Sequence, residues 1–204
     1  MPIHFFRTNS RCRERSGALR ELIRFGGTEG KMLVRPSSDF DIPAMTEIYG
    51  HHVRHGVASF ETDPPDGDEM ARRRSEVLQR GLPWLVVEFE GSVLGYAYAT
   101  QYRSRAAYQF TLEDSIYVHP MHISRGIGKL LLPELIAQCQ EFGARQMIAV
   151  IGDTDNPASI RLHARFGFRH AGVLQAVGFK FGRWMDTILM QRALGFATAF
   201  GSPK

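Results

Sequence analysis

The sequence predicts one mixed α/β domain of the α+β type, in which a central, largely antiparallel sheet is flanked by helices. The 204 residues are 44% hydrophobic, which is enough apolar material for one compact core but not for two domains. Segments with helical and with strand-like spacing of apolar residues follow one another without an internal repeat. Glu90 and Gly91 form a turn between two neighbouring strand patterns, which is typical of an antiparallel hairpin.

The first half of the chain predicts one strand, two helices and this hairpin. Pro36 ends a short apolar strand, and Ser38 with Asp41 three residues later has the spacing of a capping box at a helix start. Apolar residues then recur at helical spacing, and a polar helix follows after a loop. The predicted elements are a strand at Met32–Arg35, a helix at 42–56, a loop at Ala58–Pro65, a helix at Gly67–Arg80, and strands at Trp84–Phe89 and Val93–Tyr102.

The second half predicts strands alternating with two helices, and a closing pair of strands. A long strand pattern ends at Pro120, and a strongly apolar helix follows until Gly143. The predicted elements are a strand at Tyr108–His119, a helix opened by the sequence SRGIGK, a strand at Gln146–Ile151, a helix at Asn156–Phe166, and strands at Arg169–Phe181 and Trp184–Arg192.

The net charge of +4 is concentrated at the N-terminus. Residues 1–31 hold seven Lys or Arg and three Glu, whereas the rest of the chain is balanced. We therefore expect a basic, disordered extension at 1–31, the domain at 32–195 and a tail at 196–204. A domain without net basic charge is not expected to bind nucleic acid. Two cysteines, no apolar run of about 20 residues and no secretory signal predict a cytoplasmic protein that does not bind membranes.

The stretch EDSIYVHPMHISRGIGKLLL runs from a strand through a short loop into a glycine-opened helix. The first N–H groups of a helix have no partner within the helix, and together with the helix dipole they attract a phosphate. Gly126 and Gly128 let the backbone approach such a group, and Arg125 and Lys129 add positive charge. The loop therefore predicts a phosphate or diphosphate site.

Two common phosphate motifs do not match this loop. Leu131 stands where a dinucleotide fold needs its third glycine, and Leu130 stands where a P-loop needs Ser or Thr. A strand ending in YV, then xxGxG and an apolar helix, instead resembles the acetyl-CoA loop of the GNAT superfamily, and the resemblance covers Met32 to about Gly195. The closing run VGFKFGRWMD is most similar to the phosphinothricin and methionine sulfone or sulfoximine acetyltransferases within it.

The resemblance implies the GNAT acyl-CoA N-acyltransferase fold, acetyl-CoA as co-substrate, no metal, and a homodimer. It also implies that the N–H of Val118 polarises the thioester carbonyl. The helix NPASIRLHARFGF matches a second family signature. The residues that the resemblance assigns to acetyl-CoA are Ile116, Tyr117, Val118, Ser124, Arg125, Gly126, Ile127, Gly128, Lys129, Asn156 and Ser159.

Two residues are the predicted catalytic pair. In TLEDSIYV, Glu113 matches the residue taken as general base in this subfamily, and a base is needed because only a neutral amine attacks a thioester. Asp114 follows it and points to the opposite face of a strand. His163 stands where many GNAT enzymes have a Tyr that protonates the departing thiolate. The alternatives are an exposed strand acid for Glu113 and a packing role for His163.

The acceptor is predicted to be a small L-amino-acid analogue. Arginines grip carboxylate or oxoacid groups bidentately, and two lie just before the base strand. The predicted acceptor contacts are Phe60, Arg103, Ser104, Arg105, Glu113, Asp114 and Ser115. Packing of Phe60 in the core and solvated loop arginines remain alternatives. Lys180, Arg183 and Trp184 are expected to frame the pocket or a dimer contact.

Several other functions are weighed against this one. His51 and His55 share a helical face, but a zinc site needs a third ligand. Cys139 lies within a helix without a neighbouring base, so direct attack in a ternary complex is favoured over an acyl-enzyme. Rival acceptors are a protein N-terminus or a polyamine, and a non-catalytic acyl-CoA sensor is the rival outside catalysis.

Overall fold

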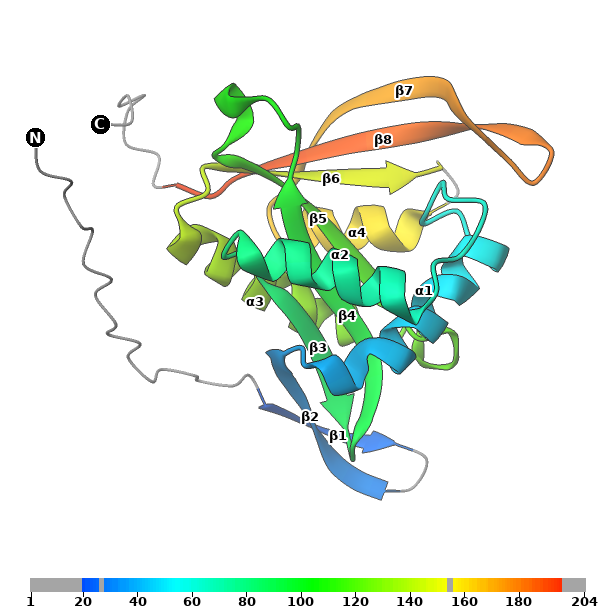
Figure 1. Cartoon of the computed structure of the whole chain (residues 1–204), viewed down its shortest axis with the longest axis vertical. Helices are drawn as coiled ribbons and strands as arrows, with labels where there is room; N and C mark the ends of the chain where they lie inside the picture. The colour runs from blue at the N-terminus through cyan, green and yellow to red at the C-terminus, as the bar shows by residue number, and fades with distance from the viewer. Residues whose placement is uncertain (1–19, 26–27, 154–155, 196–204) are drawn as a thin grey trace, which may run out of the picture.

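A computed structural model describes residues 20–25, 28–153 and 156–195, with side chains from Gly30 onward. In this part of the chain an eight-stranded sheet has the order β1-β2-β3-β4-β5-β6-β8-β7 (Figure 1). All neighbours are antiparallel except β5 and β6, so the predicted mixed fold with a largely antiparallel sheet is confirmed. The strands are β1 (Arg20–Phe25), β2 (Thr28–Pro36), β3 (Trp84–Phe89), β4 (Ser92–Gln101), β5 (Thr111–Val118), β6 (Gln146–Gly152), β7 (Arg169–Lys180) and β8 (Arg183–Ala193).

The sheet begins earlier than the sequence predicts. Residues 20–25 form β1 and pair with β2, which starts at Thr28, so both strands reach into the expected extension 1–31. The charges of Arg20, Glu21 and Arg24 interrupt the apolar pattern there, and pairing with β2 outweighs that weak local signal. The rest of the expected extension, residues 1–19, and the tail 196–204 lie outside the described residues.

Helices cover both faces of the sheet. Helices α1 (Ile42–His55) and α2 (Gly67–Gln79) pack together over β3, β4 and β5, while α3 (Ile127–Phe142) and α4 (Pro157–Arg165) pack on the opposite side (Figure 1). The predicted long strand 108–119 is shorter, because residues 106–108 form a 3-10 turn and β5 begins at Thr111. None of the helices in the described ranges is both long and apolar enough to cross a bilayer.

The apolar core lies between the sheet and these helices. Side chains from β3, β4 and α3 dominate it, because β3 and β4 are covered on both faces and α3 turns its apolar side onto them. Trp84, Tyr96 and Tyr98 stack in a row on the α1 and α2 side, with Trp84 and Tyr98 ring centroids 4.1 Å apart. The core therefore holds β4 and β5 rigidly, and these are the strands that carry the candidate site.

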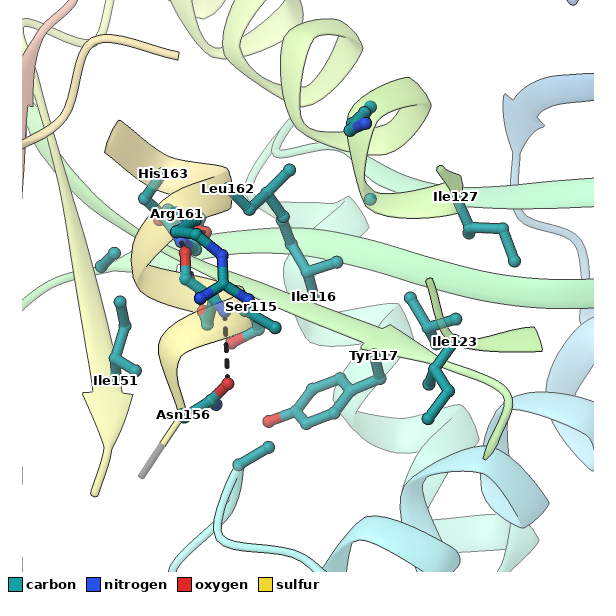
Figure 2. A pocket seen from close by; sticks show the side chains of 18 of the residues that line it. Ser115, Ile116, Tyr117, Ile123, Ile127, Ile151, Asn156, Arg161, Leu162 and His163 are labelled. Carbon is teal, nitrogen blue, oxygen red and sulfur yellow. Dashed lines mark hydrogen bonds and ion pairs between the residues drawn. The ribbon is translucent and has the colours of Figure 1, made fainter. Parts of the chain in front are cut away.

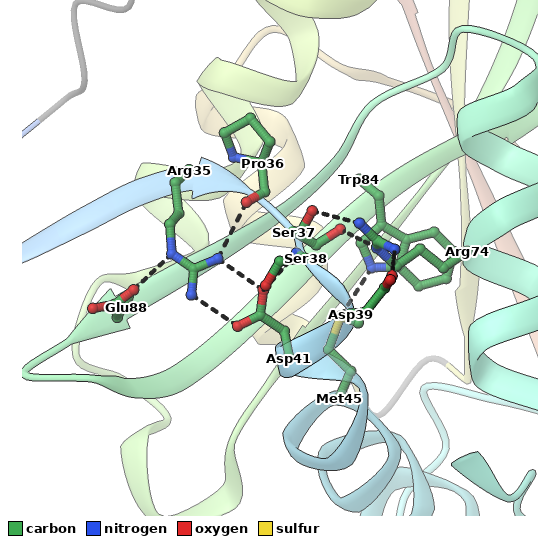
Figure 3. A network of polar contacts seen from close by, with 10 residues as sticks. All are labelled: Arg35, Pro36, Ser37, Ser38, Asp39, Asp41, Met45, Arg74, Trp84 and Glu88. Carbon is green, nitrogen blue, oxygen red and sulfur yellow. Dashed lines mark hydrogen bonds and ion pairs between the residues drawn. The ribbon is translucent and has the colours of Figure 1, made fainter. Parts of the chain in front are cut away.

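A polar network ties the start of α1 to the sheet (Figure 3). The Arg35 guanidinium donates to both carboxylate oxygens of Asp41, at 2.7 and 2.8 Å, and to Glu88 at 2.6 Å. The predicted capping box of Ser38 and Asp41 is present, so Asp41 caps the backbone and pairs with Arg35 at once. The network joins β2, β3 and α1, and it fixes the first of the two helices that cover this face of the sheet.

The parallel strands β5 and β6 separate towards their carboxyl ends. Their paired residues end with Asp114 and Ala149, but β5 continues to Val118 and β6 to Gly152. Beyond this point β5 stays paired with β4, and β6 with β8. The backbone edge of β5 after Asp114 therefore faces an opening in the sheet, which we call the splay.

Candidate active site

The splay opens into a cavity of about 880 Å³ (Figure 2). Its walls come from the end of β5, the loop before α3, the first turn of α3, the end of β6 and α4. Most of the residues predicted to hold acetyl-CoA lie in its wall, although Arg125 does not. Those that do are Ile116, Tyr117, Val118, Ser124, Gly126, Ile127, Gly128, Lys129, Asn156 and Ser159.

The loop before α3 leads into a helix start beside the cavity, where the first N–H groups have no partner within the helix. Gly126 is the N-cap of α3 with a φ of +84°, and Ser124 also has a positive φ of +63°. Such values favour glycine and turn successive amides in one direction. Gly128 lines the cavity and is also constrained by packing, because a Cβ there would lie 2.8 Å from Cδ2 of Leu162. It allows close packing of α3 on α4.

Val118 turns its own peptide groups into the splay. The N–H of His119 donates to the Leu94 carbonyl at 2.9 Å, beside the pair of Gly95 and Val118. In an antiparallel ladder a pair in that position exchanges no hydrogen bonds, so the N–H and C=O of Val118 point away from β4. By the two-residue period of a strand, Ile116 has the same orientation.

His52 holds the carbonyl of Val118 from α1. Its Nε2 lies 2.8 Å from that oxygen, and because a carbonyl only accepts, Nε2 carries the proton. Burial lowers the pKa of His52 and outweighs the bond to Val118, which raises it. The neutral ring lines the cavity. Sequence analysis missed this residue, because the spacing of three histidines on one helix says nothing about which of them meets β5.

Asp114 and His163 form a buried pair below the splay. Asp114 Oδ2 lies 2.9 Å from His163 Nε2, and the two side chains are only 2% and 5% exposed. Nδ1 of His163 lies 2.8 Å from the Ser159 carbonyl, which requires a proton on Nδ1. Burial lowers the pKa of His163, but the bond and charge of Asp114, with the Ser159 carbonyl, raise it above its ordinary value overall.

Glu113 lies on the opposite face of β5, as the strand period predicts. It is paired with Thr100, next to the pair of Ser115 and Tyr98, on the side covered by α1 and α2. Burial, together with the negative charge of Asp114, raises the pKa of Glu113 to about 7, although Arg103 opposes the rise. Glu113 does not line the large cavity, but Ser115 on the same face does. The splay thus joins the two faces of the sheet.

The predicted acceptor residues occupy different surroundings. Phe60 is 37% exposed and lies against Gly152 at the cavity rim. Arg103, Ser104 and Arg105 lie on an exposed loop after β4, and none of them lines the cavity. Of the closing hairpin, Lys180 is buried and Trp184 is 65% exposed.

The histidines of α1 lack further metal ligands in the part of the chain described. His51 and His55 have ring centroids 5.0 Å apart, but no group of three or more His, Cys, Asp or Glu in the described ranges is placed to hold a metal ion. His52 is engaged with the backbone of β5 instead. Of the three histidines, His52 therefore has a structural role at the splay.

Comparison with known proteins agrees with this architecture. The acetyltransferase (GNAT) family profile matches residues 48–168. The phosphinothricin N-acetyltransferase of Alcaligenes faecalis is 59% identical over 161 residues, which cover 79% of this chain and 82% of that protein. The L-methionine sulfoximine/L-methionine sulfone acetyltransferase of Salmonella typhimurium is 39% identical over 163 residues, 80% of this chain and 95% of that protein.

A solved structure extends the agreement to three dimensions. The crystal structure of a GNAT superfamily phosphinothricin acetyltransferase from Sinorhizobium meliloti, in complex with acetyl-CoA, matches with a TM-score of 0.81 and 46% identity. The match covers 85% of this chain and 94% of that one. Sequence and fold agree over most of both molecules, and the chain therefore belongs to the GNAT family of N-acetyltransferases.

Proposed function

We propose that this enzyme transfers the acetyl group of acetyl-CoA to the amino group of a small L-amino-acid analogue of the phosphinothricin, methionine sulfone or methionine sulfoximine type. The observation that carries the proposal is the splay, which connects a cavity ending at a helix N-terminus with a half-buried carboxylate of raised pKa on the other face. The named activities of the relatives at 59% and 39% identity agree with this acceptor class.

The cavity fits acetyl-CoA in shape and chemistry. The first turn of α3 offers N–H donors beside Ser124 and Gly126, which suit a diphosphate. The backbone groups of Ile116 and Val118 face the splay and suit the amides of the pantetheine arm. In this arrangement the N–H of Val118 polarises the thioester carbonyl, and His52 holds the following peptide in place through the Val118 carbonyl.

Glu113 acts as the general base in this proposal. A carboxylate with a pKa near 7 is ionised in about half of the molecules at neutral pH, and it accepts a proton more readily than an ordinary glutamate does. It takes the proton from the acceptor amine as the N–C bond forms and the C–S bond breaks. Arg103, whose charge already acts on Glu113, with Ser104 and Arg105 bounds the acceptor on the solvent side.

The proton for the leaving sulfur comes from Asp114 and His163 acting as one unit. Both ring nitrogens of His163 lie against acceptors, so the proton at Nε2 is shared with Asp114 and the pair is neutral overall. Giving up this proton leaves an aspartate beside a neutral histidine, and solvent restores it afterwards. This assignment keeps His163 as the predicted acid and adds Asp114 as its partner.

Transfer is direct, within a complex of both substrates. The alternative nucleophile, Cys139, is fully buried in α3, and burial raises the pKa of its thiol to about 12. A thiol in that state is not a nucleophile at neutral pH. An acyl-enzyme on Cys139 is therefore disfavoured.

A homodimer is the assembly that we propose. Strand β7 lies at the edge of the sheet (Figure 1). Its hairpin with β8 exposes several large apolar side chains. A patch of this kind on a soluble protein indicates a protein contact. Its residues, between 41% and 65% exposed, are Val173, Leu174, Val177, Phe179, Phe181 and Trp184.

Thiol release from acetyl-CoA, measured with a panel of amines, tests the proposal. We expect turnover with phosphinothricin, methionine sulfone and methionine sulfoximine, and none with spermidine or with a peptide bearing a free N-terminus. Turnover with only the last two would overturn the acceptor class. Binding of acetyl-CoA in calorimetry without turnover of any amine would identify a sensor.

A further inference from the structure

Lys180 on β7 is a buried cation that the chemistry above does not use. It is only 5% exposed, and its Nζ donates to two backbone carbonyls of the loop between α1 and α2, those of Ser59 at 2.6 Å and of Gly56 at 3.1 Å. Among the described residues no carboxylate lies within ion-pair distance of Nζ. Burying an ammonium group is costly, so a lysine kept there for packing alone would be unfavourable.

The same loop carries Phe60, and two glycines receive its ring. A Cβ on Gly178 would lie 2.3 Å from Cε2 of Phe60, and a Cβ on Gly152 would lie 3.0 Å from its Cε1 and 2.1 Å from the Val57 carbonyl. Gly178 is two residues before Lys180 on β7, and Gly152 lines the large cavity. The ring therefore lies between the closing hairpin and the rim of the cavity.

We propose that Lys180 and Gly178 are specificity-determining positioning residues: Lys180 clamps the α1–α2 loop, and Gly178 leaves the space into which Phe60 packs, so together they set the size of the acceptor pocket. The inference rests on the proposed function for its acceptor, and it replaces the expectation that Lys180 frames the pocket directly.

Other side chains anchor the same loop to the helices. The Tyr49 hydroxyl lies 2.9 Å from the Ser59 hydroxyl and donates to Glu61 at 2.9 Å, and Arg73 pairs with Glu61 at 2.7 Å. These contacts hold the loop to α1 and α2, whereas among the residues that the structure describes only Lys180 donates from the hairpin to its carbonyls. Loss of the ammonium should release the loop from the hairpin while the helices stay in place.

Lys180→Met tests the clamp, with Lys180→Arg as the conservative control. Methionine keeps the apolar stem and removes the donors, leaving two carbonyls unpaired. We expect KM for phosphinothricin to rise by roughly tenfold, with KM for acetyl-CoA nearly unchanged, and amide hydrogen exchange in residues 57–62 to accelerate. Lys180→Arg should restore most of both properties. Unchanged exchange and unchanged acceptor KM in Lys180→Met would overturn the clamp.

Gly178→Ala tests the packing of Phe60 against Gly178 and leaves the hydrogen bonds of Lys180 in place. The methyl group must displace Phe60, so we expect the ratio of kcat/KM for methionine sulfone over phosphinothricin to change by roughly tenfold, the scale of small pocket changes. Gly172→Ala is the matched control, since a Cβ at that position on β7 meets nothing within 4 Å. An equal ratio in both variants would overturn the role of Gly178.

The two proposals fail in different ways. If the wild-type protein acetylates none of the acceptors, the proposed function fails, whereas hydrogen exchange of residues 57–62 in Lys180→Met still decides the clamp. If the wild-type protein turns over and both variants behave like it, only the specificity inference fails.

Discussion

Glu113 and Asp114 are neighbours in the chain, yet their carboxylates have different surroundings. Asp114 is held by His163 between β5 and α4, while Glu113 has no ion-pair partner within 4 Å among the described residues and lies on the face covered by α1 and α2. Burial and the charge of Asp114 raise the pKa of Glu113 to about 7. Two adjacent acids on one strand can therefore have two roles.

Replacing Glu113 by Gln should remove the general base. We expect kcat to fall by about 10² or more, the usual contribution of such a group. In the wild type the ionised form accumulates above pH 7, so kcat/KM should rise with pH through an apparent pKa near 7. Steady-state kinetics from pH 5.5 to 8.5 measure both, and a variant that keeps its turnover would remove Glu113 from this role.

The same substitution should stabilise the protein at high pH. A carboxyl with a raised pKa holds its proton in the folded state from its ordinary value of 4.5 up to about 7, and the unfolded state does not. The free energy of unfolding therefore falls as pH rises through this window, by at most about 3 kcal/mol for this group. Urea unfolding should show Glu113→Gln gaining stability over the wild type at pH 8 and little at pH 4.5; the reverse order would contradict the burial of an ionised Glu113.

Asp114→Asn should change the titration of His163. Without the carboxylate, burial dominates, so the pKa of His163 should fall below its ordinary value. Ser159 on α4 and Cys139 on α3 face the imidazole and Asp114, while Glu113 interacts with Asp114 only through its charge, from the opposite face of β5. Following the ring protons by NMR against pH measures the change, and an unmoved titration would show that Asp114 does not hold the charged form.

At the scale of elements, the loop before α3 and the end of β5 form the wall of the cavity in which we propose that acetyl-CoA binds. Their geometry depends on glycine in one place and on packing in another. Gly126 has the left-handed conformation that begins the helix, while Gly128 admits Leu162 and brings α4 close. The helix that presents donors and the helix that carries His163 are therefore positioned by the same short stretch of sequence.

Gly126→Ala should weaken acetyl-CoA binding. A side chain at a φ of +84° costs about 1 kcal/mol and tends to rotate the peptide that faces the cavity. Gly91→Ala is the matched control, because Gly91 has a φ of +80° in the turn between β3 and β4, away from the cavity. Thermal unfolding should show similar losses for both variants, and calorimetry a loss of acetyl-CoA affinity only for Gly126→Ala. Equal affinities of the two variants for acetyl-CoA would show that the loop does not take part in binding.

At the scale of the whole molecule, the sheet separates two tasks. Acetyl-CoA is held from the α3 and α4 side in this proposal, and the acceptor enters from the α1 and α2 side, with the splay as the passage between them. The β7–β8 hairpin joins both the acceptor side, through Lys180, and the exposed apolar patch at the edge of the molecule. We therefore expect the same hairpin to contribute both to the dimer contact and to acceptor specificity.

Val177→Asp should dissociate the proposed homodimer. Val177 is 53% exposed within the apolar patch, and a charge buried in a contact is strongly unfavourable. Light scattering after gel filtration should give the mass of a dimer for the wild type and of a monomer for the variant. Leu78→Asp, at a 39% exposed position on α2, is the control and should leave the mass unchanged. A wild-type monomer would refute the dimer.

Local patterns in the sequence predicted most of the elements, and most of the residues proposed to bind acetyl-CoA line one cavity. The spacing of apolar residues is repeated within each helix and strand, and the SRGIGK loop is a contiguous signal, so both can be read without knowing the fold. The opposite facing of Glu113 and Asp114 follows from the strand period alone. The strand β1 was not predicted because the charges of Arg20, Glu21 and Arg24 leave no strand-like alternation of apolar residues.

Only the tertiary structure decided which distant residues meet. His163 pairs with Asp114 across 49 positions, His52 reaches the Val118 carbonyl across 66, and Lys180 reaches that of Ser59 across 121. Such contacts depend on sheet order, strand register and helix packing, which no periodicity in a single segment encodes. The sequence by itself thus determined the elements, the family and the loop that we propose as a diphosphate site, while packing determined the partners that tune and position the proposed chemistry.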